Sequence, residues 1–464
     1  MESLALQIIP LMVRGHVSPF EAGVYNMFYF FSKKIVFLVF VCIALVGCQP
    51  KVYLMPPPLG LQPDSKLFRM TEDNKDGNLL YTLYATNRMP FDPPRGGTSY
   101  SIFPSHSLKL GFVVHSVGDE GTSWEELYKQ SLQPNRDKDL LLTQVYRRER
   151  TKYHRNDDPK RISAGGEGYF DQINRILARN VDKDILVYVH GANSNFYRAT
   201  AQGAQYHHYT GHNTLVLTFS WPSAENLFKY KVDVLHARQT VPAFARLLEL
   251  LAEHTTAKKI NILAYSAGAQ VAAPGLVYLR RHYSELSDAE VKSKFRIGEV
   301  YFAAPDTDFV AFVERYLDFM NIVERTTINL NFNDSVLRLS AFQNGVSRLG
   351  RPDLSELSED EIQIMISAMR TPQLDVLNIG GSKALNIGGG HDSWYSHPWV
   401  SNDLLLLLLL NADPKDRGLE EYDFGMGAIG YYFPDNYERR IQKILEGLED
   451  KKPEDTLIGT EDMQ

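Results

Sequence analysis

A regular alternation of short apolar runs with segments of helical spacing, beginning near residue 181, constrains the fold of this chain most. Five runs have strand length, and Val232–Glu253 is one of the helical segments between them. A near-continuous apolar run such as Asp184–His190 is typical of a strand buried on both faces. The alternation predicts an α/β fold: a mostly parallel sheet with helices on both faces, whose ligands bind at the carboxyl ends of the strands. The runs cover 184–190, 214–221, 259–265, 297–304 and 326–331.

The third run ends at Ser266, inside the segment NILAYSAGAQ (261–270). Small residues follow the serine where a helix would begin, and a sharp strand-to-helix turn needs small neighbours because it crowds the backbone. This pattern is typical of a nucleophile elbow, which lifts a serine hydroxyl clear of the sheet. Ala264 stands where such elbows usually carry a glycine. The alternative is a buried helix with Ser266 as an ordinary N-cap, and this segment alone leaves both interpretations open.

A serine becomes a nucleophile when a histidine takes its proton and an acid orients that histidine. In hydrolases with an elbow the groups follow in the order serine, acid, histidine. Of the 13 histidines, only His391 and His397 lie after the fifth run. His391 follows three glycines, a flexible loop that would let its imidazole reach the elbow, whereas His397 precedes a proline and resembles a helix-entry residue. We favour His391 as the base; its alternative interpretation is a surface loop residue.

Three aspartates are candidates for the acid. Asp334 follows the fifth run directly, at the place where a carboxylate would stand at the carboxyl end of a strand. Asp306 and Asp308 follow the fourth run in the same way. We favour Asp334, although an aspartate at this position is also interpretable as a simple turn former.

The first run ends in His190-Gly191-Ala192-Asn193, a candidate oxyanion loop. There the amide of Ala192 is placed to pair with the amide of Ala267, the residue after the serine, and bind the oxyanion of a tetrahedral intermediate. His190 precedes the elbow in the chain and is interpreted as structural. Asn193 would stiffen the loop through its side chain.

The two cysteines, Cys42 and Cys48, both lie near the N-terminus, which excludes a disulfide scaffold or a cysteine-based zinc site in the globular part. Residues 27–47 carry a basic start, an apolar run and a final glycine, and they resemble a bacterial lipoprotein signal peptide in which Cys48 becomes lipidated. The alternative, an uncleaved anchor, falls short of the roughly 20 apolar residues that span a bilayer. Gln49 after the cysteine implies an outer-membrane location facing the periplasm. Residues 1–26 form an unexplained extension.

The proline-containing residues 48–78 predict a tether, and 79–440 the folded domain, with an N-terminal extension of strands at 79–88 and 108–115. The charged segment 117–165 is interpreted as an irregular, solvated insertion.

A capping box at Ser358 predicts a helix to about residue 370 that is either a crossover or part of a lid. The leucine run 404–410 predicts a wholly buried helix, since seven residues are too few to cross a membrane. Residues 446–464, rich in acidic residues and lysine, predict a disordered tail.

Charge and composition bear on partners and cofactors. A formal charge of -7 argues against nucleic acid or an anionic membrane surface as an electrostatic partner. The histidine-rich segment 206–212 has no carboxylate at ligand spacing, and the glycines near 380 and 388–390 lack the lysine of a phosphate loop. We therefore expect neither a metal nor a cofactor.

Several motifs occur in an order that resembles a bacterial branch of α/β-hydrolases known only as esterase/lipase-superfamily proteins of unknown function. The resemblance covers roughly residues 79 to 410. The motifs are YATNR (84–88), HGANSNF (190–196), FSWPS (219–223), AYSAG (264–268), AAPDTD (303–308), FNDSVLRLS (332–340) and GHDSWYSHPWVSNDL (390–404). That branch commonly has histidine-serine-methionine-glycine at its elbow, whereas this chain has Tyr265-Ser266-Ala267-Gly268.

The resemblance implies an α/β-hydrolase fold with Ser266 as nucleophile, Asp334 as acid and His391 as base. It predicts a serine hydrolase, a carboxylesterase or lipase-like enzyme that acts on a small-molecule or lipid ester through an acyl-enzyme. The changed elbow leaves the hydroxyl in place and puts the substrate preference in question. The alternative is a catalytically silent, lipid-anchored binding or structural module of the cell envelope, because a fold does not fix a function.

Overall fold

The computed structural model describes residues 51–61, 77–93, 99–154, 156–225, 229–381, 385 and 390–449 of the 464-residue chain. The predicted extension, signal segment and Cys48 lie outside these residues, as do Gly388 and Gly389 of the loop before His391. None of the described helices is long and apolar enough to cross a membrane.

The described strands form a single mixed sheet in the order β1-β4-β3-β2-β6-β5-β7-β8-β9-β10-β12-β11. Its middle, from β2 to β12, is parallel, and both ends are antiparallel. This confirms a mostly parallel sheet with an N-terminal strand extension. The strands are β1 (Val52–Tyr53), β2 (Leu79–Phe91), β3 (Ser99–Val117), β4 (Leu141–His154), β5 (Ile185–Val189), β6 (Leu215–Phe219), β7 (Ile260–Tyr265), β8 (Ile297–Ala303), β9 (Val323–Leu330), β10 (Leu374–Asn378), β11 (Glu420–Asp423) and β12 (Ile429–Tyr432).

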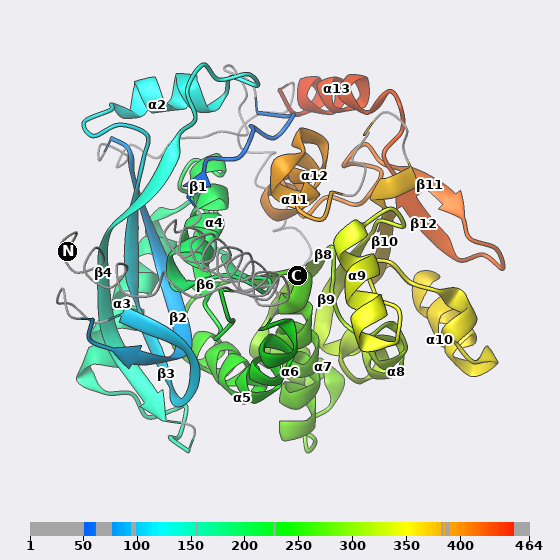
Figure 1. The fold of residues 1–464 in the computed structure, drawn as a ribbon, viewed down its shortest axis with the longest axis horizontal. Helices are drawn as coiled ribbons and strands as arrows, with labels where there is room; N and C mark the ends of the chain where they lie inside the picture. The colour runs from blue at the N-terminus through cyan, green and yellow to red at the C-terminus, as the bar shows by residue number, and fades with distance from the viewer. Residues whose placement is uncertain are drawn as a thin grey trace, which may run out of the picture. The chain divides into compact units, whose positions relative to one another are not determined.

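Helices follow most of the parallel strands and cover the two faces of the sheet (Figure 1). They are α2 (Trp124–Ser131), α3 (Ala164–Arg179), α4 (Phe196–Tyr209), α5 (Tyr230–His254), α6 (Ala269–His282), α7 (Asp288–Phe295), α8 (Phe309–Phe319), α9 (Ser335–Asn344), α10 (Glu359–Met369), α11 (Ser393–Ser396), α12 (Pro398–Leu410) and α13 (Tyr437–Glu449).

Strand β5 illustrates why the two faces are both apolar. All five of its side chains are buried, and they alternate between two hydrophobic clusters. Ile185, Val187 and Val189 join the cluster beneath α3, α5, α6, α7, α8 and α10. Leu186 and Tyr188 join the cluster beneath α2, α4, α12 and α13. A strand covered on both faces has no polar side, which is why its sequence is a continuous apolar run.

The prediction that 117–165 is an irregular insertion is wrong, because this segment has regular secondary structure. It holds α2 and the long strand β4, which pairs antiparallel with β3 from Ser107↔His154 to Val117↔Leu142. Half of the side chains of β4 are exposed, so its basic residues do not conflict with strand pairing. Arg147 lies over the ring of Tyr100, 4.7 Å from its centroid.

Strand β2 begins at Leu79, as expected. The prediction of a tether is wrong for residues 52–61. Leu54, Met55 and Leu61 are buried in the core, and Val52 pairs with Leu142 of β4. The apolar residues between the prolines bury enough surface to fix this segment to the domain.

The C-terminal elements extend the sheet by two strands and add α13, which packs through Tyr437 and Ile441. Residues 446–449 belong to α13, so the predicted tail is wrong there, and its remainder lies outside the described residues. The leucine run lies in α12, where 404–408 are buried. Helix α10 packs on α8 and β10, as a crossover does.

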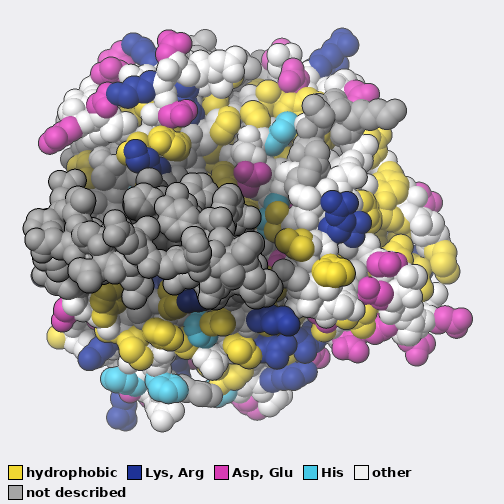
Figure 2. Space-filling model, viewed as in Figure 1, with side chains coloured by type: hydrophobic (Ala, Val, Ile, Leu, Met, Phe, Trp, Pro, Cys, Tyr) yellow, Lys and Arg dark blue, Asp and Glu magenta, His cyan; other side chains and the backbone are white. Residues whose placement is uncertain are grey.

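Basic, acidic and hydrophobic side chains are interspersed over the coloured part of the face in Figure 2. The sheet places the carboxyl ends of β5, β7, β8 and β9 side by side, and the residues that follow these strands form the candidate site.

Candidate active site

The turn after β7 has the strained backbone of a nucleophile elbow. Ser266 has a φ of 51°, a left-handed conformation that costs a non-glycine residue about 1–3 kcal/mol. Gly268 is required, because a Cβ there would lie 2.4 Å from the carbonyl oxygen of Val189. The amide of Asp306 donates to the Ser266 carbonyl at 3.0 Å. Ser266 therefore does not simply cap a regular helix, since a Ser/Thr N-cap normally adopts extended φ/ψ.

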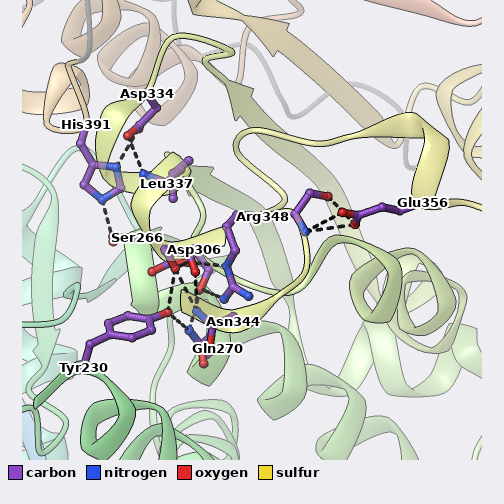
Figure 3. A network of polar contacts seen from close by, with 12 residues as sticks. Tyr230, Ser266, Gln270, Asp306, Asp334, Leu337, Asn344, Arg348, Glu356 and His391 are labelled. Carbon is purple, nitrogen blue, oxygen red and sulfur yellow. Dashed lines mark hydrogen bonds and ion pairs between the residues drawn. The ribbon is translucent and has the colours of Figure 1, made fainter. Parts of the chain in front are cut away.

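Ser266, His391 and Asp334 form one hydrogen-bonded chain, although 125 residues separate the serine from the histidine (Figure 3). The Oγ of Ser266 lies 2.7 Å from Nε2 of His391, and Oδ2 of Asp334 lies 2.7 Å from Nδ1. An ionised carboxylate only accepts hydrogen bonds, so the contact with Asp334 favours the tautomer that carries its proton on Nδ1, in which Nε2 can accept from the serine hydroxyl.

The two carboxylate oxygens of Asp334 have separate tasks. Oδ1 accepts from the amides of Val336 and Leu337, both at 2.9 Å, and thereby caps α9. Oδ2 faces His391. Asp334 is thus both the turn former and the partner of the imidazole, because one oxygen fixes the carboxylate so that the other points at His391.

The competing residues lie elsewhere. His397 caps α12 by accepting from the amide of Trp399 at 3.2 Å, as expected of a helix-entry residue. Asp308 caps α8. Asp306 is buried, and its Oδ1 accepts from Nε of Arg348 at 2.6 Å and from the Ser340 hydroxyl at 2.7 Å (Figure 3).

The site is largely shielded from solvent. Ser266 is 7% exposed, Asp334 is fully buried and the side chain of His391 is 11% exposed. The ring of Tyr265, which precedes Ser266, packs on His391 with centroids 5.4 Å apart and on Trp394 at 5.3 Å. Burial raises the pKa of the Tyr265 hydroxyl well above its ordinary value, so this side chain is neutral.

The candidate oxyanion loop lies against the elbow. A Cβ on Gly191 would stand 3.0 Å from the Cβ of Ser266, so the backbone before Ala192 closely approaches this serine. Ala267 stands at the start of the short helix that opens α6, where amides have no intrahelical carbonyl to pair with. Both amides therefore stand in segments that adjoin Ser266.

His190 is structural, as its position in the chain indicates. Its ring stacks on Trp221 at 5.1 Å, and the Trp221 indole donates to the His190 carbonyl at 2.6 Å. Burial, with the nearby charge of Arg88, lowers the pKa of His190 to about 3, so the ring stays neutral.

Arg88, the last residue of the motif YATNR, lies beside the candidate site although its sequence pattern did not single it out. Its guanidinium is fully buried and donates to the Ser194 carbonyl at 2.7 Å, next to the oxyanion loop. The sequence shows only a charged residue after the mostly apolar run 79–85, which does not distinguish a buried site residue from an exposed one.

The histidine-rich segment packs in the core. His212 lies against Trp124 with centroids 4.7 Å apart, and burial lowers the pKa of His207 to about 4. Across the described ranges, no group of three or more His, Cys, Asp or Glu side chains is arranged to hold a metal ion.

Comparison with known proteins gives a family. The sequence profile of the family described as alpha/beta hydrolase of unknown function (DUF900) matches residues 169–406, just over half of the chain. No curated protein matches the chain in sequence. A solved structure with some similarity is a lipase-esterase related protein from Clostridium acetobutylicum ATCC 824, at 12% identity and a TM-score of 0.18. That match covers 43% of this chain and 74% of the other, and at such a TM-score it carries no argument.

Proposed function

Since the chain belongs to this family of alpha/beta hydrolases of unknown function, we propose that it is a serine hydrolase that cleaves carboxylic esters. The observation that carries the proposal is the chain of two 2.7 Å contacts from Asp334 through His391 to Ser266. A binding module has no need of a strained serine whose hydroxyl lies against an imidazole nitrogen.

In the proposed reaction, the Ser266 oxygen attacks the ester carbonyl carbon while Nε2 of His391 takes the hydroxyl proton. Asp334 stabilises the imidazolium that forms. The amides of Ala192 and Ala267 bind the oxyanion of the tetrahedral intermediate. His391 then gives its proton to the departing alcohol, and water attacks the acyl-enzyme by the same route. An acceptor alcohol in place of water would turn hydrolysis into acyl transfer.

Labelling with a fluorophosphonate tests this proposal, because the reagent modifies only an activated serine. The full chain in detergent is expected to label, whereas Ser266→Ala and His391→Ala are expected to lose the label, with at least about a 10⁴-fold loss of esterase activity. Ser401→Ala is the matched control, since Ser401 is buried in α12 and, among the described residues, its hydroxyl donates to the carbonyl of Pro398 alone. A folded parent that does not label would favour the silent envelope module.

We further propose that the enzyme is attached to the bacterial outer membrane through a lipid on Cys48 and faces the periplasm, where lipid esters are within reach. The support is the signal-like segment 27–47. Cys48→Ser should accumulate an unprocessed precursor without incorporated palmitate, whereas Cys42→Ser should mature normally. Normal maturation of Cys48→Ser would contradict the anchor.

A further inference from the structure

Arg88, at the carboxyl half of β2, is a buried cation that directly contacts the segment carrying the oxyanion loop. Its side chain is fully buried, and its guanidinium donates in four directions. The acceptors are the carbonyls of Ser194 at 2.7 Å, Ser101 at 3.3 Å and Ser223 at 3.4 Å, and the Ser220 hydroxyl at 3.1 Å.

These contacts join three segments that are far apart in the sequence. Ser194 follows the oxyanion loop, Ser220 and Ser223 follow β6, and Ser101 lies in β3. Ser194 is held twice, because the Ser223 hydroxyl accepts from its amide at 3.1 Å and donates to its carbonyl at 2.8 Å. The position of Ser194 is therefore fixed by Arg88 and Ser223 together.

The same loop is fixed on its other side. The His190 carbonyl accepts from the Trp221 indole, and the Asn193 amide donates to Oδ2 of Asp233 at 3.3 Å. Gly191 and Ala192 lie between these fixed points. Rigid flanks determine where the Ala192 amide points, and an oxyanion hole works through donors that are already oriented before the reaction.

The charge of Arg88 is costly for the fold. Burial lowers the pKa of Arg88 to about 10, while Glu225 and Asp233 raise it, so the side chain remains a cation at neutral pH. In the described part of the chain no carboxylate forms an ion pair with it within 4.0 Å, so its hydrogen bonds go to neutral oxygens. An apolar residue of similar volume often stabilises a core at least as well as a buried charge. A buried arginine that has no ion pair within 4.0 Å among the described residues therefore points to a role beyond stability.

We propose that Arg88 is a positioning residue for the oxyanion hole: its planar fork holds Ser194 and thereby orients the Ala192 amide toward the carbonyl oxygen of the substrate. The inference rests on the proposed serine-hydrolase function. A lysine keeps the charge but has a single nitrogen, which cannot reach acceptors on three segments at once. Positioning of Ser194 therefore depends on the planar shape of the guanidinium as well as on its charge.

The test compares Arg88→Lys with the parent on a p-nitrophenyl ester. We expect kcat to fall about 10- to 100-fold while KM changes less than about threefold, because the oxyanion contact strengthens only in the transition state. Arg88→Ala should lose more activity and regain part of it in millimolar guanidinium chloride. A purely structural arginine would lower the melting temperature without this split between kcat and KM.

Arg417→Lys is the matched control. Arg417 is as deeply buried, but its partners are Asp375 and Asp403, away from the loop. Its replacement should lower the melting temperature and leave kcat of the folded enzyme unchanged, with no guanidinium effect on Arg417→Ala. If the Arg88 variants do not fold, Ser223→Ala tests the same link, with a smaller loss in kcat at constant KM.

Parent-like kcat in folded Arg88→Lys, or in Ser223→Ala when Arg88→Lys does not fold, would overturn the inference. Guanidinium that rescues the Arg417 and Arg88 variants alike would overturn it too. Fluorophosphonate labelling of the parent separates the two proposals: a labelled parent with an unchanged Arg88→Lys refutes the positioning role alone. An unlabelled, folded parent refutes both, because there is then no oxyanion hole to position.

Discussion

Asp306 and Asp334 occupy equivalent places in the chain, yet the fold gives them opposite tasks. Each follows the end of a parallel strand, β8 or β9, and the two strands are neighbours in the sheet. Both carboxylates are buried. Asp306 neutralises Arg348 and supports the elbow through its amide, whereas Asp334 faces the imidazole of His391 (Figure 3). Two acids of the same sequence pattern therefore differ only in the partner that the tertiary structure places beside them.

The largest effect is expected at Asp334. Asp334→Asn should lower kcat about 10³- to 10⁴-fold, because an amide facing Nδ1 favours the wrong tautomer of His391. The free energy of unfolding should change by less than about 1 kcal/mol, since asparagine caps a helix about as well as aspartate. Ester hydrolysis and urea denaturation measure the two quantities. A large loss of stability with intact kcat would remove Asp334 from the reaction.

The matched change at Asp306 should do the reverse. Asp306→Asn leaves the guanidinium of Arg348 buried beside a neutral amide, and breaking a buried ion pair costs about 3–5 kcal/mol. The kcat of the folded enzyme should stay within about threefold of the parent. Replacing both partners, as in Asp306→Leu with Arg348→Met, should recover part of the stability. If Asp306→Asn instead abolishes turnover in a stable protein, the assignment of the two acids is wrong.

A third buried acid, Glu299 in β8, sharpens the comparison because no cation contacts it closely enough to form an ion pair within the described residues. Burial, and then the charge of Asp375, raise the pKa of Glu299 to about 7, while Arg417 lowers it less. A raised pKa means that the folded state binds the proton more tightly. The stabilisation is therefore complete below about pH 4.5, declines as the pH rises toward 7, and is absent above that.

Glu299→Gln should remove this decline, which amounts to at most about 3 kcal/mol between pH 4.5 and 7. Urea denaturation of parent and variant across this range measures it. The variant should be more stable than the parent at pH 8. Glu299 is thus a buried acid that faces no imidazole among the described residues and whose nearby cation does not offset the effect of burial on its pKa. Parallel curves for the two proteins would show that Glu299 does not titrate in this window.

The sequence predicted the structure correctly where the local residue pattern agrees with the tertiary environment. Strands β5 and β6 are buried at every position, so each appears in the sequence as a nearly continuous apolar run. The elbow was recognisable because a crowded turn permits only small residues after Ser266. The order of motifs led to Ser266, Asp334 and His391, and the fold brings the serine and the aspartate each within hydrogen-bond distance of the histidine.

Three features could not be predicted from the sequence, each for a physical reason. Strand β4 lies near an edge of the sheet, so its charged side chains remain in solvent and its sequence resembles a loop. Residues 52–61 contain prolines typical of a linker, yet their apolar side chains fill the core beside α4 and α12. Arg88 gave no usable signal, because its four acceptors come from segments more than ten residues away.

The sequence by itself determined the alternating architecture and a short set of candidate nucleophile, acids and bases, because each depends on residues adjacent in the chain, whereas the left-handed turn at Ser266 became visible only in the structure. Only the tertiary structure decided which acid meets His391, which one neutralises Arg348, and that the buried Arg88 donates to the carbonyl of Ser194. Hydrogen bonds require partners within about 3 Å. When two distant segments meet at this distance across a sheet, neither of their sequences reveals the contact.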